Sequence, residues 1–258
     1  MKQLILCLLL VLLGACEIYH SSESGADPGG SLGQGGSMAR FAVSGDYLYT
    51  VDHSHLRLFD ISKAEEPEFL SGKDQYMDMG IETIFPMDTL LFIGSQTGMY
   101  IFNITRPAFP QPISHVSHIT SCDPVVASGN YAYVTLNSEH YWCGRSTNEL
   151  HIYDLTDIYN PALIHIEMAF LHPKGLGIDG NKLFICDDVL KVYDVSDPAK
   201  PIWIDDTTDI PQAAWMDAYD VIPLNGVLLL IGAKGLYQFD YTGDKLSFIS
   251  KIEVSTAD

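Results

Sequence analysis

The chain has 258 residues, 47% of them hydrophobic, and 33 acidic against 14 basic side chains give it a formal net charge of −19. Such an excess of negative charge repels phosphate backbones and anionic headgroups, which argues against a nucleic-acid partner. The apolar fraction is sufficient for one domain of closely packed elements.

The first sixteen residues form a targeting segment. Lys2 supplies a positive charge, and the apolar stretch from Leu4 to Leu13 is too short to span a bilayer. The run Leu13-Gly14-Ala15-Cys16 is similar to the bacterial lipobox, which predicts that a signal peptide of residues 1–15 is removed and that Cys16 is lipidated. The alternative is an ordinary secretory signal that is cut nearby.

Residues 16–37 are expected to be a flexible tether, because they are rich in glycine and serine. Acyl chains on Cys16, at about 0.8 kcal/mol per buried CH2, would hold the globular part, residues 38–258, at a membrane. Glu17 rather than aspartate follows that cysteine, which favours the outer membrane of a Gram-negative bacterium. The sequence therefore predicts a lipid-anchored cell-envelope protein, but not the side of the membrane that it faces.

A short phrase recurs five times along the rest of the chain. Alternating apolar residues lead to an Asp or Asn, and in each copy a Ser or Thr follows two positions later. The copies are residues 56–62, 99–105, 150–156, 190–196 and 236–242. The alternation has the period of two that a β-strand needs, and the Asp or Asn can accept a hydrogen bond from the backbone N–H two residues on. Pro67, Pro110, Pro161 and Pro201 follow the first four copies, where an outermost fourth strand would begin.

Two further apolar runs around a tight turn precede each phrase. The clearest turns are Gly45-Asp46, Gly129-Asn130, Gly180-Asn181 and Asn225-Gly226, dipeptides that accept positive φ angles. Each repeat therefore predicts four antiparallel strands, and repeats roughly 40–50 residues long are typical of propeller blades. We expect an all-β fold, a five-bladed β-propeller of four-stranded antiparallel blades. A stacked solenoid or a sandwich is the alternative, and no strand is evident that would close the ring by passing from one terminus to the blade of the other.

The repeat resembles a known family. The phrase itself, the run Gly-Asn-Tyr-Ala-Tyr-Val at residues 129–134 and the run Val-Tyr-Asp-Val-Ser-Asp-Pro-Ala-Lys-Pro at residues 192–201 are similar to LVIVD-repeat proteins. The resemblance covers residues 38–258 and is loosest in the second and fifth repeats, the fifth having Ser247 where the others have proline. It implies a bacterial cell-surface β-propeller and supplies no catalytic residues.

Three cysteines lie in the expected propeller, which would be in an oxidising compartment. In a propeller, the connection between blades and the loop between the second and third strands lie on the same face, which would bring Cys122 and Cys143 together. We expect a disulfide between them, worth about 3 kcal/mol by the chain-entropy estimate. Cys186 lies on a strand and is expected to be a buried free thiol. The adjacent Asp187-Asp188 is typical of a solvated turn rather than a calcium site.

Four charged residues are expected at one end of the central channel. Alignment of the repeats places Ala39, Glu82, Asp123, Lys174 and Asp220 at the starts of the innermost strands. Three carboxylates and an ammonium around an axis could hold a divalent metal ion or a polar ligand. The alternative is that these acids bind neighbouring backbone N–H groups in a solvated channel.

The connections near this end of the channel carry His118, His172, Trp215 and Asp217. Trp215 could offer a stacking platform for a sugar or a peptide, or it could plug the top of the ring. His118 or His172 could act as a general base if the site were catalytic.

The sequence contains no nucleophile elbow, zinc-protease motif or phosphate loop. The leading hypothesis is a non-catalytic scaffold at the cell envelope that binds a protein, peptide or glycan ligand at the channel mouth, with no cofactor. The second is a metal-assisted hydrolase or lyase with the mouth carboxylates as metal ligands. The third is a helper in outer-membrane protein assembly.

Overall fold

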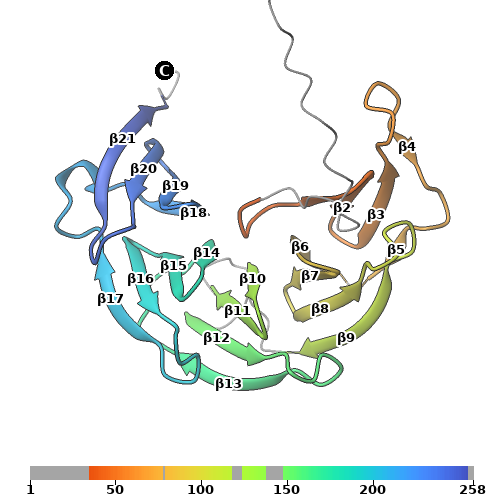
Figure 1. Ribbon diagram of the computed structural model, residues 1–258, viewed down its shortest axis with the longest axis horizontal. Helices are drawn as coiled ribbons and strands as arrows, with labels where there is room; N and C mark the ends of the chain where they lie inside the picture. Colours follow the sequence, from red (N-terminus) through yellow and green to blue (C-terminus); the bar gives the residue numbers. More distant parts are fainter. Residues whose placement is uncertain (1–34, 78, 118–123, 138–147, 255–258) are drawn as a thin grey trace, which may run out of the picture.

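The structure, a computed structural model, describes residues 35–77, 79–117, 124–137 and 148–254 (Figure 1). Within these ranges the elements are β-strands, apart from one short 3-10 helix, η1 (Pro211–Ala213). No helix in the described part of the chain is long and apolar enough to cross a membrane.

The strands form five sheets, which follow one another along the chain as blades 1 to 5. Blade 1 comprises β1 (Phe41–Ser44), β2 (Tyr47–Val51), β3 (His55–Asp60), β4 (Glu68–Phe69) and β5 (Gln75–Tyr76). Blade 2 comprises β6 (Ile81–Met87), β7 (Leu90–Ser95), β8 (Gly98–Asn103) and β9 (Gln111–Ser117). Blade 3 comprises β10 (Val125–Ser128), β11 (Tyr131–Leu136), β12 (Glu149–Asp154) and β13 (Ala162–Glu167). Blade 4 comprises β14 (Leu176–Asp179), β15 (Lys182–Cys186), β16 (Leu190–Asp194) and β17 (Ile202–Asp206). Blade 5 comprises β18 (Ala218–Leu224), β19 (Val227–Gly232), β20 (Gly235–Asp240) and β21 (Ser247–Glu253).

The sheets are arranged radially around a common axis (Figure 1). Within each sheet the strands pair antiparallel in the order of the sequence, so that β1, β6, β10, β14 and β18 lie innermost. These inner strands pack against one another in succession from β1 to β18. The predicted five-bladed β-propeller is therefore confirmed, and the solenoid and the sandwich are excluded.

The recurring phrase forms the turn that it predicts. Its Asp or Asn accepts a hydrogen bond from the backbone N–H two residues later in all five blades, at 2.7 to 2.9 Å. The acceptors are Asp60, Asn103, Asp154, Asp194 and Asp240. Where the proline is present, the outermost strand begins one residue after it. The local hydrogen bond thus ends the third strand and turns the chain toward the fourth.

Blade 1 departs from the regular pattern at its outer edge. Its fourth strand is broken into β4 and β5, each of two residues and each paired with β3. Phe69 lies opposite Phe59, and Tyr76 lies opposite His55, so the two pieces cover opposite ends of β3. Residues 70–74 between them leave the sheet, which shortens the outer edge of this blade.

Four hydrophobic clusters hold the blades together, one at each junction between consecutive blades. Representative residues are Leu58 and Ile93 between blades 1 and 2, Ile101 and Val134 between blades 2 and 3, Ile152 and Leu183 between blades 3 and 4, and Val192 and Phe239 between blades 4 and 5. Each fully buried aliphatic or aromatic side chain contributes about 1.5–3 kcal/mol. The core of the molecule is therefore a series of interfaces between sheets.

The ring has no such cluster between blade 5 and blade 1 in the described part of the chain. Figure 1 shows that the outer strands of these two blades are farther apart than those of neighbouring blades elsewhere. The segment that precedes β1 reaches across this side at the centre, where Ser37 is buried and bonded to Asp220 of β18. Ring closure therefore rests on this segment, although composition alone assigns Ser37 to the tether.

Candidate ligand-binding site at the mouth of the propeller

One face of the ring, here called the mouth, carries the starts of the inner strands together with the loops between second and third strands. In blade 2, the amide Nε2 of Gln96, in the loop after β7, donates a hydrogen bond to Oε1 of Glu82 at 3.0 Å. In blade 4, the backbone N–H of Lys174 donates to the carbonyl of Cys186 at 2.7 Å. These contacts confirm that both sets of segments share one face.

Lys174 is the only predicted mouth cation, and it lies in a compact polar group. Its Nζ donates to Oδ1 of Asp217 at 2.5 Å and lies 4.7 Å from the centre of the Tyr219 ring. The carbonyl of Lys174 also accepts a hydrogen bond from the Thr135 hydroxyl at 2.6 Å, which ties β14 to blade 3. Asp217, in the connection into blade 5, therefore supplies the counter-ion of this ammonium, and Tyr219, near the start of β18, supplies the ring beside it.

Asp220 is largely enclosed and serves the segment before blade 1. Its carboxylate accepts hydrogen bonds from the Ser37 hydroxyl at 3.0 Å and from the backbone N–H groups of Met38 and Val221. A Cβ on either Gly36 or Gly175 would overlap this carboxylate, so both positions require glycine. Burial raises the pKa of Asp220, and the three donors oppose that shift. Asp220 therefore behaves as the alternative expectation described, in which an acid at the start of a strand binds neighbouring backbone N–H groups.

Glu82 lies at the start of β6, and Ala39 lies in the segment that leads into β1. Glu82 is partly exposed, and Gln96 is its partner. The carbonyl of Ala39 accepts a hydrogen bond from the N–H of Ile84 at 2.9 Å, which joins blade 1 to blade 2. Lys174 and Asp220 lie on neighbouring inner strands, whereas Glu82 belongs to another blade and makes separate contacts.

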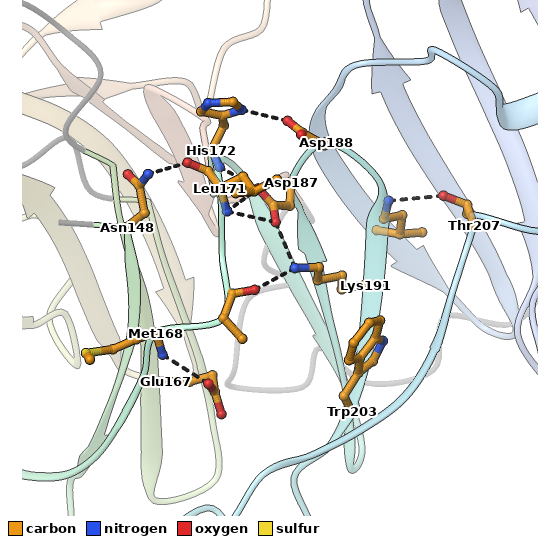
Figure 2. Close-up of polar contacts among 12 residues, drawn as sticks. Asn148, Glu167, Met168, Leu171, His172, Asp187, Asp188, Lys191, Trp203 and Thr207 are labelled. Atoms are coloured by element: carbon orange, nitrogen blue, oxygen red, sulfur yellow. Dashed lines mark hydrogen bonds and ion pairs between the residues drawn. The ribbon is translucent and has the colours of Figure 1, made fainter. Parts of the chain in front are cut away.

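His172 lies at the rim of the mouth, in the connection into blade 4 (Figure 2). Its Nδ1 lies 2.6 Å from Oδ1 of Asp188, and its backbone N–H donates to Oδ1 of Asp187 at 2.6 Å. Asp187 also accepts from the N–H of Leu171 and forms an ion pair with Lys191 at 2.9 Å. The loop Asp187-Asp188 therefore holds the connection that carries His172.

The two aspartates of this loop have different environments. The side chain of Asp188 is about half exposed, as expected for a solvated turn. The prediction was wrong for Asp187, whose side chain is only 1% exposed. The ammonium of Lys191, bonded to Asp187 and to the carbonyl of Ala169, explains how this carboxylate can be buried.

Trp215 is the most exposed large apolar side chain of the described residues, at 86%. It follows η1 with a φ angle of 58°, and Asp217 two residues later has a φ of 46°. Both values lie in the left-handed region, which is costly for residues other than glycine. This exposure excludes the interpretation in which Trp215 plugs the top of the ring. The indole instead projects from the rim of the mouth.

Several predicted residues lie outside the described ranges. These are Cys16, His118, Cys122, Asp123 and Cys143. The Cys122–Cys143 disulfide and the part of the mouth around Asp123 therefore stay predictions. Among the described cysteines, Cys186 is buried and free, as expected.

The described residues contain no group of three His, Cys, Asp or Glu side chains that could hold a metal ion. Below the mouth, the central channel contains a cavity of about 270 Å³. Its lining includes Phe85, Val126, Ile178 and Pro223 from four inner strands, and Ser37 from the segment before blade 1. This interior is mainly apolar, whereas the charged groups lie at its rim.

Sequence reasoning missed Tyr219 and the buried pair of Asp187 with Lys191, and it did not predict that Asp217 pairs with Lys174. Tyr219 directly precedes Asp220 near the start of β18, and a search of that segment for aromatic residues could have found it. The sequence gives no comparable signal for Asp187, because its burial depends on the loop from the preceding blade.

The five radial, four-stranded blades define the chain as a five-bladed β-propeller. The sequence profile of the LVIVD repeat family matches residues 35–71 and 121–141. Together with the five radial blades, this match supports an LVIVD-repeat β-propeller. No curated protein matches the chain.

Solved structures share the fold at low sequence identity. A functionally unknown protein from Desulfotomaculum acetoxidans has a TM-score of 0.64 and 10% identity, with 88% of this chain and 70% of that chain covered. KlAtg21, solved in complex with the coiled coil of AgAtg16, has a TM-score of 0.60 and 9% identity, with 81% and 68% covered. A protein from Lactobacillus plantarum has a TM-score of 0.59 and 14% identity, also with 81% and 68% covered. At these identities the likeness establishes the propeller fold alone.

Proposed function

We propose that this chain is a lipid-anchored cell-envelope propeller whose mouth binds a protein, peptide or glycan without catalysing a reaction. The observation that carries the proposal is Trp215, an indole that is 86% exposed on backbone with a φ of 58°. Such a conformation costs about 1–3 kcal/mol and persists only where the surroundings impose it. An aromatic ring held in this way outside the core is suited to stacking against a ligand.

The groups near Trp215 fit a polar ligand with a flat or apolar part. Lys174 and Asp217 present opposite charges, and the Tyr219 ring is partly exposed beside the Lys174 ammonium. Peptides and glycans combine hydrogen-bonding groups with apolar faces, and aromatic side chains with polar partners bind both. The acidic charge of the whole chain makes an anionic ligand a poorer match.

The proposed anchor relates the mouth to the membrane. Residues 35–38 dock beside Asp220, so the tether that follows Cys16 joins the propeller at the mouth. A flexible chain of n residues spans roughly 5–6 Å times the square root of n. Lipidation of Cys16, removal of residues 1–15 and the outer-membrane location rest on the lipobox and on Glu17.

Crosslinking mass spectrometry on intact cells tests the mouth as the binding site. We expect Trp215→Ala to remove the crosslinks of the mouth to its partner, whereas Tyr159→Ala should leave them unchanged. Tyr159 is a matched control because it is 71% exposed and lies in the loop between β12 and β13, away from the mouth. An unchanged crosslink pattern in Trp215→Ala would show that the mouth is not the site.

Two further measurements address the anchor and the disulfide. Metabolic labelling with a clickable fatty acid should label the wild type in the outer-membrane fraction, and Cys16→Ser should lose the label. Peptide mapping without reduction should recover Cys122 linked to Cys143; recovery of both as alkylated free thiols would contradict the pairing. Elemental analysis of the purified protein tests the second hypothesis. A stoichiometric divalent metal that is lost in Asp123→Ala would favour the hydrolase or lyase over the scaffold.

A further inference from the structure

The two end blades differ from the three middle blades in one respect. In β7, β11 and β15, the second strands of blades 2 to 4, every residue after the first is buried. In β2 and β19, the second strands of blades 1 and 5, buried residues alternate with residues that are not. Successive residues of a strand point to opposite faces, so blades 1 and 5 are each covered on one face only.

The uncovered face of blade 5 is largely apolar, although the register also places Asp220, Gln238 and Asp240 on it. Residues that lie opposite one another in the sheet and share this face are Ile222, Val227, Leu229, Ile231, Leu236 and Ile252. Their neighbours on the other face, such as Leu230 and Phe239, are fully buried against blade 4. Ile231 is 50% exposed at this uncovered face.

The uncovered face of blade 1 is also largely apolar. It carries Phe41, Val43, Leu48, Phe59 and Phe69 by the register of β1 to β4, and the same register places Thr50 and Arg57 beside Phe41. Phe41 is 59% exposed, and the rings of Phe59 and Phe69 lie 5.3 Å apart. Contiguous apolar surface of this kind on a soluble domain marks an interaction site.

We propose that the uncovered face of blade 5 in one copy of this chain docks on the uncovered face of blade 1 in a second copy. The argument is continuity with the interfaces inside the chain. Each blade has a leading face, which points toward the next blade in the sequence, and a trailing face, which points toward the preceding blade. At four junctions, the leading face of one blade packs on the trailing face of the next through a shared hydrophobic cluster. Blade 5 exposes the leading face of this series and blade 1 exposes the trailing face, so a second copy offers each of them the kind of surface that covers the middle blades.

The charge distribution permits such an interface. Most residues of the two uncovered faces carry no charge. The exceptions are Asp220 and Asp240 on blade 5, which accept hydrogen bonds within the chain, and Arg57 on blade 1, which pairs with Asp52. The net charge of −19 repels a second copy at long range. Association should therefore strengthen as salt screens this repulsion, since the contact itself is largely apolar.

The contact joins two different surfaces, which gives it a signature. Each copy carries one of each surface, so it can bind a second copy at either end. Ile231→Arg spoils only the blade 5 surface, and Phe41→Arg spoils only the blade 1 surface. Both side chains are at least half exposed, so both variants are expected to fold.

The experiment is light scattering on the purified full chain in detergent, over a range of concentrations, with the mass of the protein component resolved. The wild type should exceed the monomer mass at micromolar concentrations, and each variant should shift half-association to at least tenfold higher concentration. A mixture of the two variants should form dimers and no larger species, because only one intact pair of surfaces remains. The matched control is Ile202→Arg on β17, where Ile202 is 62% exposed away from the gap, and it should behave as the wild type.

Three results would overturn the proposal. A wild type that is monomeric at all concentrations shows that a second copy does not cover these faces. Association that survives either single variant shows a contact through other surfaces or through two like surfaces. A monomeric mixture of the two variants shows that the blade 5 and blade 1 surfaces do not bind each other. Matching circular dichroism spectra of all variants establish that charge, and not unfolding, is responsible.

Discussion

Ser37 and Asp220 are 183 positions apart in the sequence, and the hydroxyl of Ser37 donates a hydrogen bond to Oδ1 of Asp220 at 3.0 Å. The same hydroxyl accepts a hydrogen bond from the backbone N–H of Leu176 at 2.8 Å. One fully buried hydroxyl thus joins the segment before blade 1 to the inner strands of blades 4 and 5. The first and last blades are tied by hydrogen bonds at the mouth, on the side of the ring that lacks a packed junction.

Replacing Ser37 by alanine should therefore destabilise the propeller. The change removes a donor to a largely buried carboxylate and leaves the buried N–H of Leu176 without its acceptor, which costs about 1–3 kcal/mol. Urea unfolding followed by tryptophan fluorescence measures this loss in the free energy of unfolding. Ser71→Ala is the control, because Ser71 is exposed; equal stabilities of the two variants would show that the bridge contributes nothing.

The stability conferred by Asp220 should depend on pH in a defined direction. Burial raises its pKa above the ordinary value of 3.8, so the folded protein holds this proton more tightly than the unfolded chain. Its contribution is fully present below the unfolded pKa and is lost as the pH rises through the folded pKa. Asp220→Asn does not titrate, so its free energy of unfolding relative to the wild type should increase as the pH rises above the ordinary value of 3.8 and through the raised pKa of Asp220. Urea titrations at several pH values check this, and a difference that is constant with pH would contradict it.

The blades could be predicted from the sequence because their signals are local. The period of two along each strand and the hydrogen bond from Asp194 or Asn103 to the N–H two residues later involve only neighbouring positions. Repetition of these local signals gives the number of blades. The broken outer strand of blade 1 was missed, because the proline before β4 looks the same as in the regular blades.

The mouth could be predicted only in part, because its contacts join distant segments. Alignment of the repeats finds Glu82, Lys174 and Asp220, but it does not show which of them have internal partners. Asp220 bonds to Ser37 and Lys174 pairs with Asp217, and neither pair follows from spacing in the sequence. The exposure of Trp215 likewise depends on the backbone of a connection that occurs in one blade only.

Cys186 should be unreactive in the folded protein. It is fully buried, and burial, together with the nearby carboxylate of Asp220, raises the pKa of its thiol well above the ordinary value. Since the thiolate is the reactive form, iodoacetamide at about pH 8 should modify Cys186 only after unfolding in urea. Mass spectrometry of the peptide measures the modified fraction. An Ile202→Cys variant, exposed on β17, should react in the native state, and equal labelling of the two thiols would contradict the prediction.

The buried ion pair of blade 4 should be worth far more than its exposed neighbour. Asp187 pairs with Lys191 at 2.9 Å and accepts the backbone N–H groups of Leu171 and His172 (Figure 2). The Lys191 ammonium also lies over the rings of Phe170 and Trp203. Asp187→Ala leaves this ammonium without its counter-ion and should lower the free energy of unfolding by about 3–5 kcal/mol. Asp188→Ala removes only the half-exposed contact with His172 and should cost less than about 1 kcal/mol. Thermal or urea unfolding of the two variants tests the difference, and similar losses would mean that the low exposure of Asp187 does not determine its contribution.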